Sequence, residues 1–160
     1  MDTDTRTTSI GEAAAKGALA GLAGGVALML TEQTGRRTIL PVGADTTSTA
    51  AQAVKAAASE HDRSPSRRTA EITGATIELA WCAALGAAFG VLHSRLRTPA
   101  IVDGLALAAL AYVATNSSKG VLPRIGMTPP LHQNVEEAAI PIASHVAFGV
   151  TTAAVFEATV

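Results

Sequence analysis

The stretch GALAGLAGGVALMLT, residues 17–31, contains no Asp, Glu, Lys or Arg. Three later stretches share this property, namely residues 79–94, 104–118 and 138–156. The four are 15, 16, 15 and 19 residues long, whereas a helix needs about 20 mostly apolar residues to cross a bilayer. Charged side chains at the ends of a span can reach the lipid headgroups, so each span can include a flanking charge. The predicted membrane spans are therefore residues 13–31, 74–93, 99–116 and 139–157.

The composition of the 160-residue chain favours the same interpretation. Charged residues make up 16% and aromatic residues 3% of it, the mean hydropathy is +0.31, and alanine supplies much of the apolar share. A soluble core of this size normally needs larger side chains, because alanine buries little area. The net charge of −1 excludes a strongly basic nucleic-acid surface. The single cysteine excludes a disulfide scaffold and a cysteine-cluster metal site.

Small residues recur one helical turn apart in two of the predicted spans. Gly17, Gly21 and Gly25 share one face of the first span, and Gly86 and Gly90 share one face of the second. In lipid, such faces let helix backbones approach closely, whereas each glycine would cost a soluble helix about 1 kcal/mol relative to alanine. We therefore expect an all-α membrane protein that also packs as a homo-oligomer through these faces. A soluble four-helix bundle is the alternative.

The second half of the chain repeats part of the first at an offset of 63 residues. The segment ATIELAWCAALGAAFGVL, residues 75–92, aligns with AAIPIASHVAFGVTTAAV, residues 138–155, with identities that include Gly86 over Gly149. The first and third spans are followed by similar ILPVG and VLPRIG motifs. The alignment predicts a helical hairpin repeat, in which two tandem hairpins face the same way.

This topology divides the chain between two sides of the membrane. Side A is defined by both termini and the turn at residues 93–99; side B is defined by the loops at residues 32–73 and 117–138. A short surface helix is predicted at residues 47–60, either as a cap over the bundle or lying on the membrane surface. Side B carries eight Lys and Arg residues and side A four, which predicts a cytoplasmic side B.

Near side B, polar residues lie at membrane depth, where they are costly unless paired. Glu78, Tyr112, Asn116 and His145 form the candidate polar membrane site, and helix rise places Glu78 and His145 roughly 6–9 Å from the side B end. Glu78 and His145 could form a proton-relay pair or a single buried hydrogen bond that joins two helices. Trp81 and Tyr112 fit an interfacial aromatic belt or, alternatively, a ligand cage.

Near side A, Asp103 lies about one turn into its predicted helix. Arg95 and Arg97 belong to the preceding tight turn, so we expect a structural ion pair between Asp103 and these arginines. The alternative is that Asp103 is a coupling carboxylate for a transported ion.

No cofactor and no metal are expected. By helix rise His93 and His145 lie about 20 Å apart, too far to share a haem iron. His132, Glu136 and Glu137 could join His145 at a metal, but their spacing matches no ligand motif. Signatures of hydrolases, P-loop proteins and zinc peptidases are absent from the sequence, so we do not expect an enzyme.

One long segment carries a family resemblance. Residues 120–149 read GVLPRIGMTPPLHQNVEEAAIPIASHVAFG. The features that matter are prolines in the last connection and a histidine followed by an aromatic and a glycine: Pro123, Pro129, Pro130, His145, Phe148 and Gly149. This segment resembles the YagU-like bacterial inner-membrane proteins of unknown function. The resemblance implies a multi-pass protein of the bacterial inner (plasma) membrane, without an established activity or catalytic residues.

Two function classes follow. The first is a membrane scaffold or accessory protein, with the lipid bilayer, further copies of the chain or another membrane protein as partners and no nucleic acid. The second is a small channel or proton-coupled transporter that uses Glu78 and His145. Because four short spans enclose little volume, we expect no cavity of about 300 Å³ or more within one chain. Any pathway would then form between subunits.

Overall fold

The computed structural model describes residues 9–96, 98–117, 119–124 and 135–159, and every regular element in these ranges is helical. The helices are α1 (Ile10–Ile39), α2 (Thr49–Ser59), α3 (Arg67–Leu96), α4 (Ala100–Asn116), α5 (Val121–Arg124) and α6 (Val135–Thr159). Three of them, α1, α3 and α6, are long and apolar enough to cross a membrane. The apolar helix α4 is shorter, with 17 residues.

Serine caps set the starts of the first three helices. Ser9, Ser48 and Ser66 precede α1, α2 and α3, and each hydroxyl oxygen accepts a hydrogen bond from the backbone N–H three residues later, at 3.1 to 3.2 Å. Such caps satisfy N–H groups that have no partner inside the helix. Pro99 precedes α4, where its lack of an N–H costs nothing.

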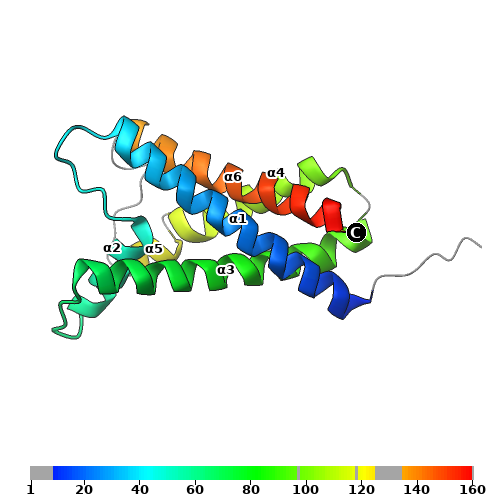
Figure 1. Ribbon diagram of the computed structural model, residues 1–160, viewed down its shortest axis with the longest axis horizontal. Helices are drawn as coiled ribbons and strands as arrows, with labels where there is room; N and C mark the ends of the chain where they lie inside the picture. Colours follow the sequence, from blue (N-terminus) through cyan, green and yellow to red (C-terminus); the bar gives the residue numbers. More distant parts are fainter. Residues whose placement is uncertain (1–8, 97, 118, 125–134, 160) are drawn as a thin grey trace, which may run out of the picture.

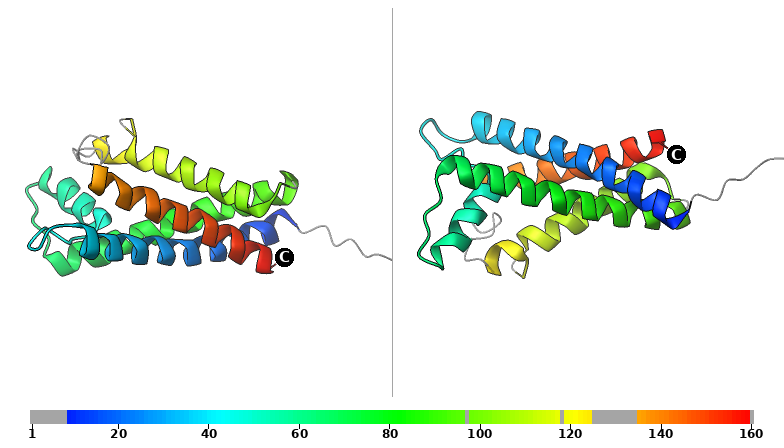
Figure 2. Two further views of the ribbon diagram at one scale, coloured as in Figure 1. Left: turned by 90° about the horizontal axis from the view of Figure 1, so that it is seen from above. Right: turned by 60° about the horizontal axis from the view of Figure 1, so that its bottom comes forward.

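The long helices lie side by side in the order α3, α1, α6, α4 (Figure 1). The two outer helices, α3 and α4, are joined by a short turn at side A, where the C-terminus also lies. From that turn they diverge toward side B, and they contact each other little along their length (Figure 2). The short helices α2 and α5 lie at side B, against α3 and α4 respectively.

Glycines bring α1 and α3 into backbone contact. A methyl group on Gly86 would lie 2.6 Å from the Cα of Gly21, and one on Gly17 would lie 3.0 Å from the Cα of Gly90. Gly25 faces α3 at the same crossing. Only glycine fits at these distances, because a Cβ atom would displace the opposite backbone. The faces that the sequence assigned to a homo-oligomer are therefore covered inside one chain.

A second set of glycines lets α6 approach α4 and α1 closely. A methyl group on Gly104 of α4 would lie 2.7 Å from the carbonyl oxygen of Gly149, and one on Gly24 of α1 would lie 2.9 Å from the Phe148 ring. Gly149 is the residue that aligns with Gly86 in the sequence repeat. Each of these two aligned glycines thus lies at a close crossing, Gly86 with α1 and Gly149 with α4.

Aromatic rings fill the core at side A. His93 stacks on Phe89 with ring centroids 5.3 Å apart, and Phe156 of α6 meets both rings edge-on at 5.6 and 5.7 Å. Edge-on and stacked pairs are favourable arrangements for such rings. Together with the glycine crossings they leave side A densely packed.

At side A, the partner of Asp103 is a histidine and not one of the expected arginines. Asp103 pairs with His93, whose Nδ1 lies 2.5 Å from the carboxylate, and the His93 Nε2 lies 3.1 Å from Glu157. Arg95 is exposed and pairs with no described residue, while Arg97 lies outside the described residues. Side chains two positions apart on an α-helix point in directions that differ by about 200° around the helix axis. Arg95 therefore points away when His93 points inward.

Candidate functional site

A cavity of about 380 Å³ lies toward side B. Its walls come from α3 and α4 on either side and from α1 and α6 behind, and α2 and α5 contribute residues at the wide end. The expectation that one chain has no cavity of this size is wrong. Divergence of α3 and α4 creates the space, and the short helices supply walls that four spans alone would lack.

Several predicted polar residues line this cavity. Glu78 reaches it from α3, Asn116 from α4 and His145 from α6. Tyr112 is not on the lining, but its ring meets that of His145 edge-on, with centroids 5.5 Å apart. Trp81 lines the same wall as Glu78, one turn further along α3, and 44% of its surface is exposed.

His145 is held by hydrogen bonds to its own helix and to α4. Its Nδ1 lies 2.7 Å from the carbonyl oxygen of Pro141, which can only accept, so Nδ1 carries a proton and donates. Its Nε2 lies 3.2 Å from the Thr115 hydroxyl, which also accepts a 2.7 Å bond from the Asn116 amide. These contacts join α4 to α6. No hydrogen bond links His145 to Glu78, although both line the cavity.

Glu78 makes no hydrogen bond or ion pair with any described residue. It projects from the α3 wall and is partly buried. A carboxylate in an apolar cavity is unstable without a counter-charge or hydrogen-bond donors. This side chain is therefore the group on the cavity wall whose bonding needs are least satisfied by the described chain.

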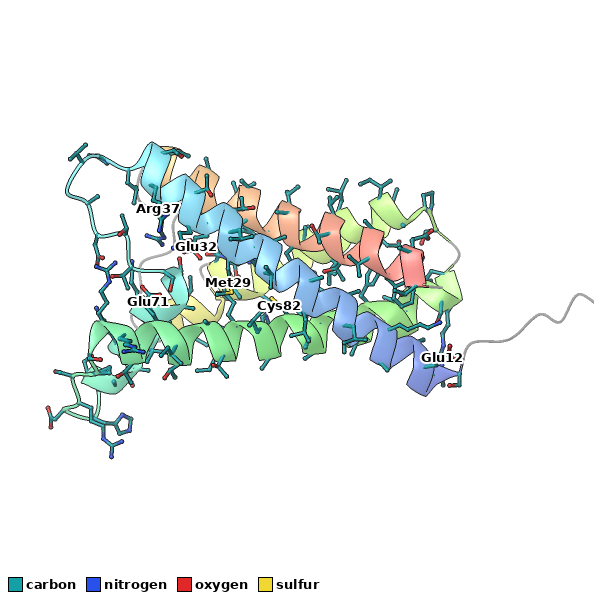
Figure 3. All side chains as sticks on the ribbon, in the orientation of Figure 1. Glu12, Met29, Glu32, Arg37, Glu71 and Cys82 are labelled. Atoms are coloured by element: carbon teal, nitrogen blue, oxygen red, sulfur yellow. The ribbon has the colours of Figure 1, made fainter. Side chains whose placement is uncertain are left out.

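Glu32, which directly follows the first predicted span, belongs to the site although the sequence pattern did not predict it. Glu32 is only 5% exposed and lines the cavity from α1. Figure 3 labels Glu32 on α1. Its carboxylate accepts hydrogen bonds from the Arg36 Nε–H at 2.9 Å and from the backbone N–H of Thr49 at 2.8 Å. Arg36 also donates to the Thr49 hydroxyl at 2.7 Å. The i,i+4 spacing of Glu32 and Arg36 in the sequence could have predicted their ion pair. The contact between Glu32 and α2 depends on the tertiary structure and could not be predicted from the spacing.

The charges on the cavity wall are therefore unbalanced. Glu32 and Glu78 line it, and no Lys or Arg among the described residues does. Arg36 neutralises Glu32 from outside the lining, which leaves the Glu78 carboxylate as one uncompensated negative charge when ionised.

The loop that leads into α2 is ordered by an acidic side chain. The carboxylate of Asp45 accepts hydrogen bonds from the hydroxyl and the backbone N–H of Thr47, at 2.5 and 2.9 Å. These bonds favour the ionised form and hold the pKa of Asp45 below its usual range, with burial opposing them weakly. Asp45 thus fixes the start of the segment that covers the cavity.

Comparison with protein-family models, with curated proteins and with solved structures finds no match to this chain. The residues quoted for the YagU-like resemblance are only partly described, because Pro129 and Pro130 fall outside the described ranges. The metal site considered from the sequence also lies mostly outside the described part of the structure, namely His132 and the side chains of Glu136 and Glu137. Among the described residues, no group of three or more His, Cys, Asp or Glu could hold a metal ion.

Proposed function

We propose that the chain is a multi-pass membrane protein with four spans in two tandem hairpins. The three long apolar helices support membrane insertion. The fourth, α4, has 17 residues and would be about 26 Å long, close to the thickness of a bilayer core. Large apolar side chains are exposed on every one of these helices, including Leu19 on α1, Ile77 on α3, Leu110 on α4 and Val146 on α6. Exposed apolar surface on all four helices suits lipid contact.

The hairpin arrangement is supported by the sequence repeat and by the equivalent glycine crossings at Gly86 and Gly149. The excess of Lys and Arg at side B favours a cytoplasmic location for α2 and α5. The family resemblance favours the bacterial plasma membrane. We assign no catalytic step to the chain.

Within that membrane we propose an accessory role, in which the protein binds an apolar molecule in its cavity. The observation that carries this proposal is a cavity of about 380 Å³, within the size range of ligand sites in proteins. It lies between two helices that diverge toward side B. In a bilayer this gap would face lipid, so an apolar ligand could enter sideways without crossing water.

A proton-coupled transporter is the second candidate, because Glu78 and His145 line one cavity. Transport needs access from both sides of the membrane. At side A the close crossing at Gly86 and the rings of Phe89 and Phe156 pack tightly, so this arrangement suits a binding site with one entrance better than a continuous pathway.

Two measurements test the proposed function. In the first, a C-terminally tagged chain is expressed in bacteria, and the membranes are washed with carbonate. Recovery in the washed membrane, with the tag cleaved by protease in spheroplasts, is the expected result. Recovery in the soluble fraction would overturn the membrane proposal.

The second measurement uses Trp81, the only tryptophan in the chain, as a reporter on the cavity wall. The purified protein in phosphatidylcholine nanodiscs is titrated with a bromoalkane, whose bromine quenches indole fluorescence. We expect quenching that saturates near one molecule per chain and that the unbrominated alkane reverses. Quenching that rises linearly with no saturation would reflect bilayer partitioning alone and would contradict a binding role.

A further inference from the structure

We propose that the cavity binds a lipophilic ammonium ion, with its apolar chain toward the membrane centre and its cationic nitrogen beside the carboxylate of Glu78. This inference rests on the proposed binding function and adds the chemical class of the ligand.

The first argument is that polar side chains form one band across an otherwise apolar cavity wall; beyond this band toward side B, Ile77 on α3, Leu122 on α5 and Pro141 on α6 line the wall again. The polar band consists of Glu32 on α1, Glu78 on α3, Asn116 on α4 and His145 on α6. Toward side A, about one to two turns further along the same helices, lie Leu28, Leu85, Ala111 and Phe148. A polar band with an apolar wall on its side A flank fits an amphiphile better than a uniformly apolar molecule.

The second argument is the sign of the charge in this polar band. Glu32 is already bonded to Arg36 and Thr49, whereas Glu78 has no partner among the described residues. An ionised carboxylate at this depth gains most from a cation that brings its own positive charge. An ammonium head supplies it. A phosphate or carboxylate head would instead meet two acidic side chains, with no lysine or arginine among the described lining residues.

The third argument is the aromatic side chain beside that carboxylate. Trp81 follows Glu78 by three positions, so both lie on one face of α3, and both line the cavity. A cation next to an indole face is attracted by its negative electrostatic potential. Glu78 and Trp81 therefore offer an ammonium group two compatible partners on the same wall.

The test compares three probes with the same brominated dodecyl chain and different heads: trimethylammonium, alcohol and carboxylate. The full-length protein in phosphatidylcholine nanodiscs is titrated with each, and site-specific quenching of Trp81 is measured by reversal with the unbrominated analogue. We expect the ammonium probe to bind at least tenfold more tightly than the alcohol, and the carboxylate probe to bind most weakly.

Substitution then tests the assigned residue. Glu78→Gln keeps the shape of the side chain and removes its charge, and we expect the ammonium and alcohol probes to bind this variant within twofold of each other. Glu78→Asp keeps the charge and should retain a preference for ammonium. Glu60→Gln is the matched control, because Glu60 is an exposed acid at the end of α2 that does not line the cavity; it should behave like the unmodified chain.

Each outcome is decisive. Equal saturable binding of the ammonium and alcohol probes to the unmodified chain would overturn this inference and leave the proposed binding function standing. Tighter binding of the carboxylate probe would also overturn it. If none of the three probes gives saturable quenching of Trp81, the proposed binding function itself is overturned. The comparison of the three probe head groups uses the unmodified chain, so its result stands even if a substitution prevents folding.

Discussion

The two ends of this helical bundle share the four long helices and differ in how closely those helices approach each other. Toward side A, glycines at the α1–α3 and α4–α6 crossings leave no room for a single added methyl group. Toward side B, α3 and α4 have separated, and the space between them is a cavity. The comparison teaches that glycine crossings close the α1–α3 and α4–α6 pairs. Among the described residues α3 and α4 share no such crossing, and these two helices diverge and leave room for a ligand.

The largest expected effect comes from closing the space at a glycine crossing. Gly86→Ala would place a methyl group 2.6 Å from the Cα of Gly21, so α1 and α3 would have to move apart. We expect a loss of about 3 kcal/mol in the free energy of unfolding, despite the better helix propensity of alanine. The measurement is unfolding of the detergent-solubilised protein, followed by far-UV circular dichroism. Gly11→Ala is the control, because nothing lies within 4 Å of the added methyl group, and its stability should not fall.

The next effect contrasts the same substitution at the two ends. Ala153 is 2% exposed and packs beside Gly104, so Ala153→Leu should cost about 2 kcal/mol through overpacking. Ala53 lines the cavity from α2, so Ala53→Leu has room and should change stability by less than about 0.5 kcal/mol. It should also abolish saturable quenching of Trp81 by the bromoalkane. Equal losses of stability at both sites would contradict the distinction between the two ends.

A smaller effect is expected from the polar link at side A. His93→Phe keeps an aromatic ring against Phe89 but removes the bonds to Asp103 and Glu157. We expect a loss of about 1.5 kcal/mol, typical of hydrogen bonds to charged groups. His61→Phe, at an exposed position on side B, should change stability little. The unfolding assay measures both, and no difference between them would show that the link contributes nothing.

The smallest effect concerns the loop that leads to α2. The pKa of Asp45 is lower in the folded protein than its usual value, so its ionised form stabilises the fold above the usual pKa of about 4, and this contribution is lost as the pH falls through the lower folded-state pKa. Because Asp45 is exposed, Asp45→Asn should cost no more than about 0.5 kcal/mol at neutral pH. Unfolding measured from neutral to acid pH should show the variant and the unmodified chain converging. A difference that grows toward acid pH would contradict the assignment.

The sequence was informative wherever the structure depends on local pattern. Charge-free stretches located the long helices, since every predicted span falls within or beside α1, α3, α4 or α6. The helices α1 and α3 extend well past the predicted spans at side B, because a helix can continue beyond the apolar stretch that defined the prediction. Glycine spacing indicated surfaces of close approach, but spacing alone does not say which helix covers a surface.

The site was less readable, because it depends on directions and distances between helices. Glu78 and His145 were placed at similar depth from helix rise, and both line the cavity; their depth did not reveal that His145 bonds to Thr115 instead. Arg95 was expected to pair with Asp103 from proximity in the chain, whereas helix rotation gives that place to His93. The cavity itself arises from the divergence of α3 and α4, which no periodicity in the sequence encodes.

The central position of α1 has a consequence for synthesis. One face of this helix packs on α3, and the other, with Gly24, packs on α6, which leaves the ribosome after α1, α3 and α4. About 120 residues separate the end of α1 from the end of α6, and translation at about 5–20 residues per second makes that interval roughly 6–24 s. Throughout it, the second glycine face of α1 has no native partner. A nascent chain that lacks α6 therefore exposes this small-residue surface of α1, and completion of α6 covers it.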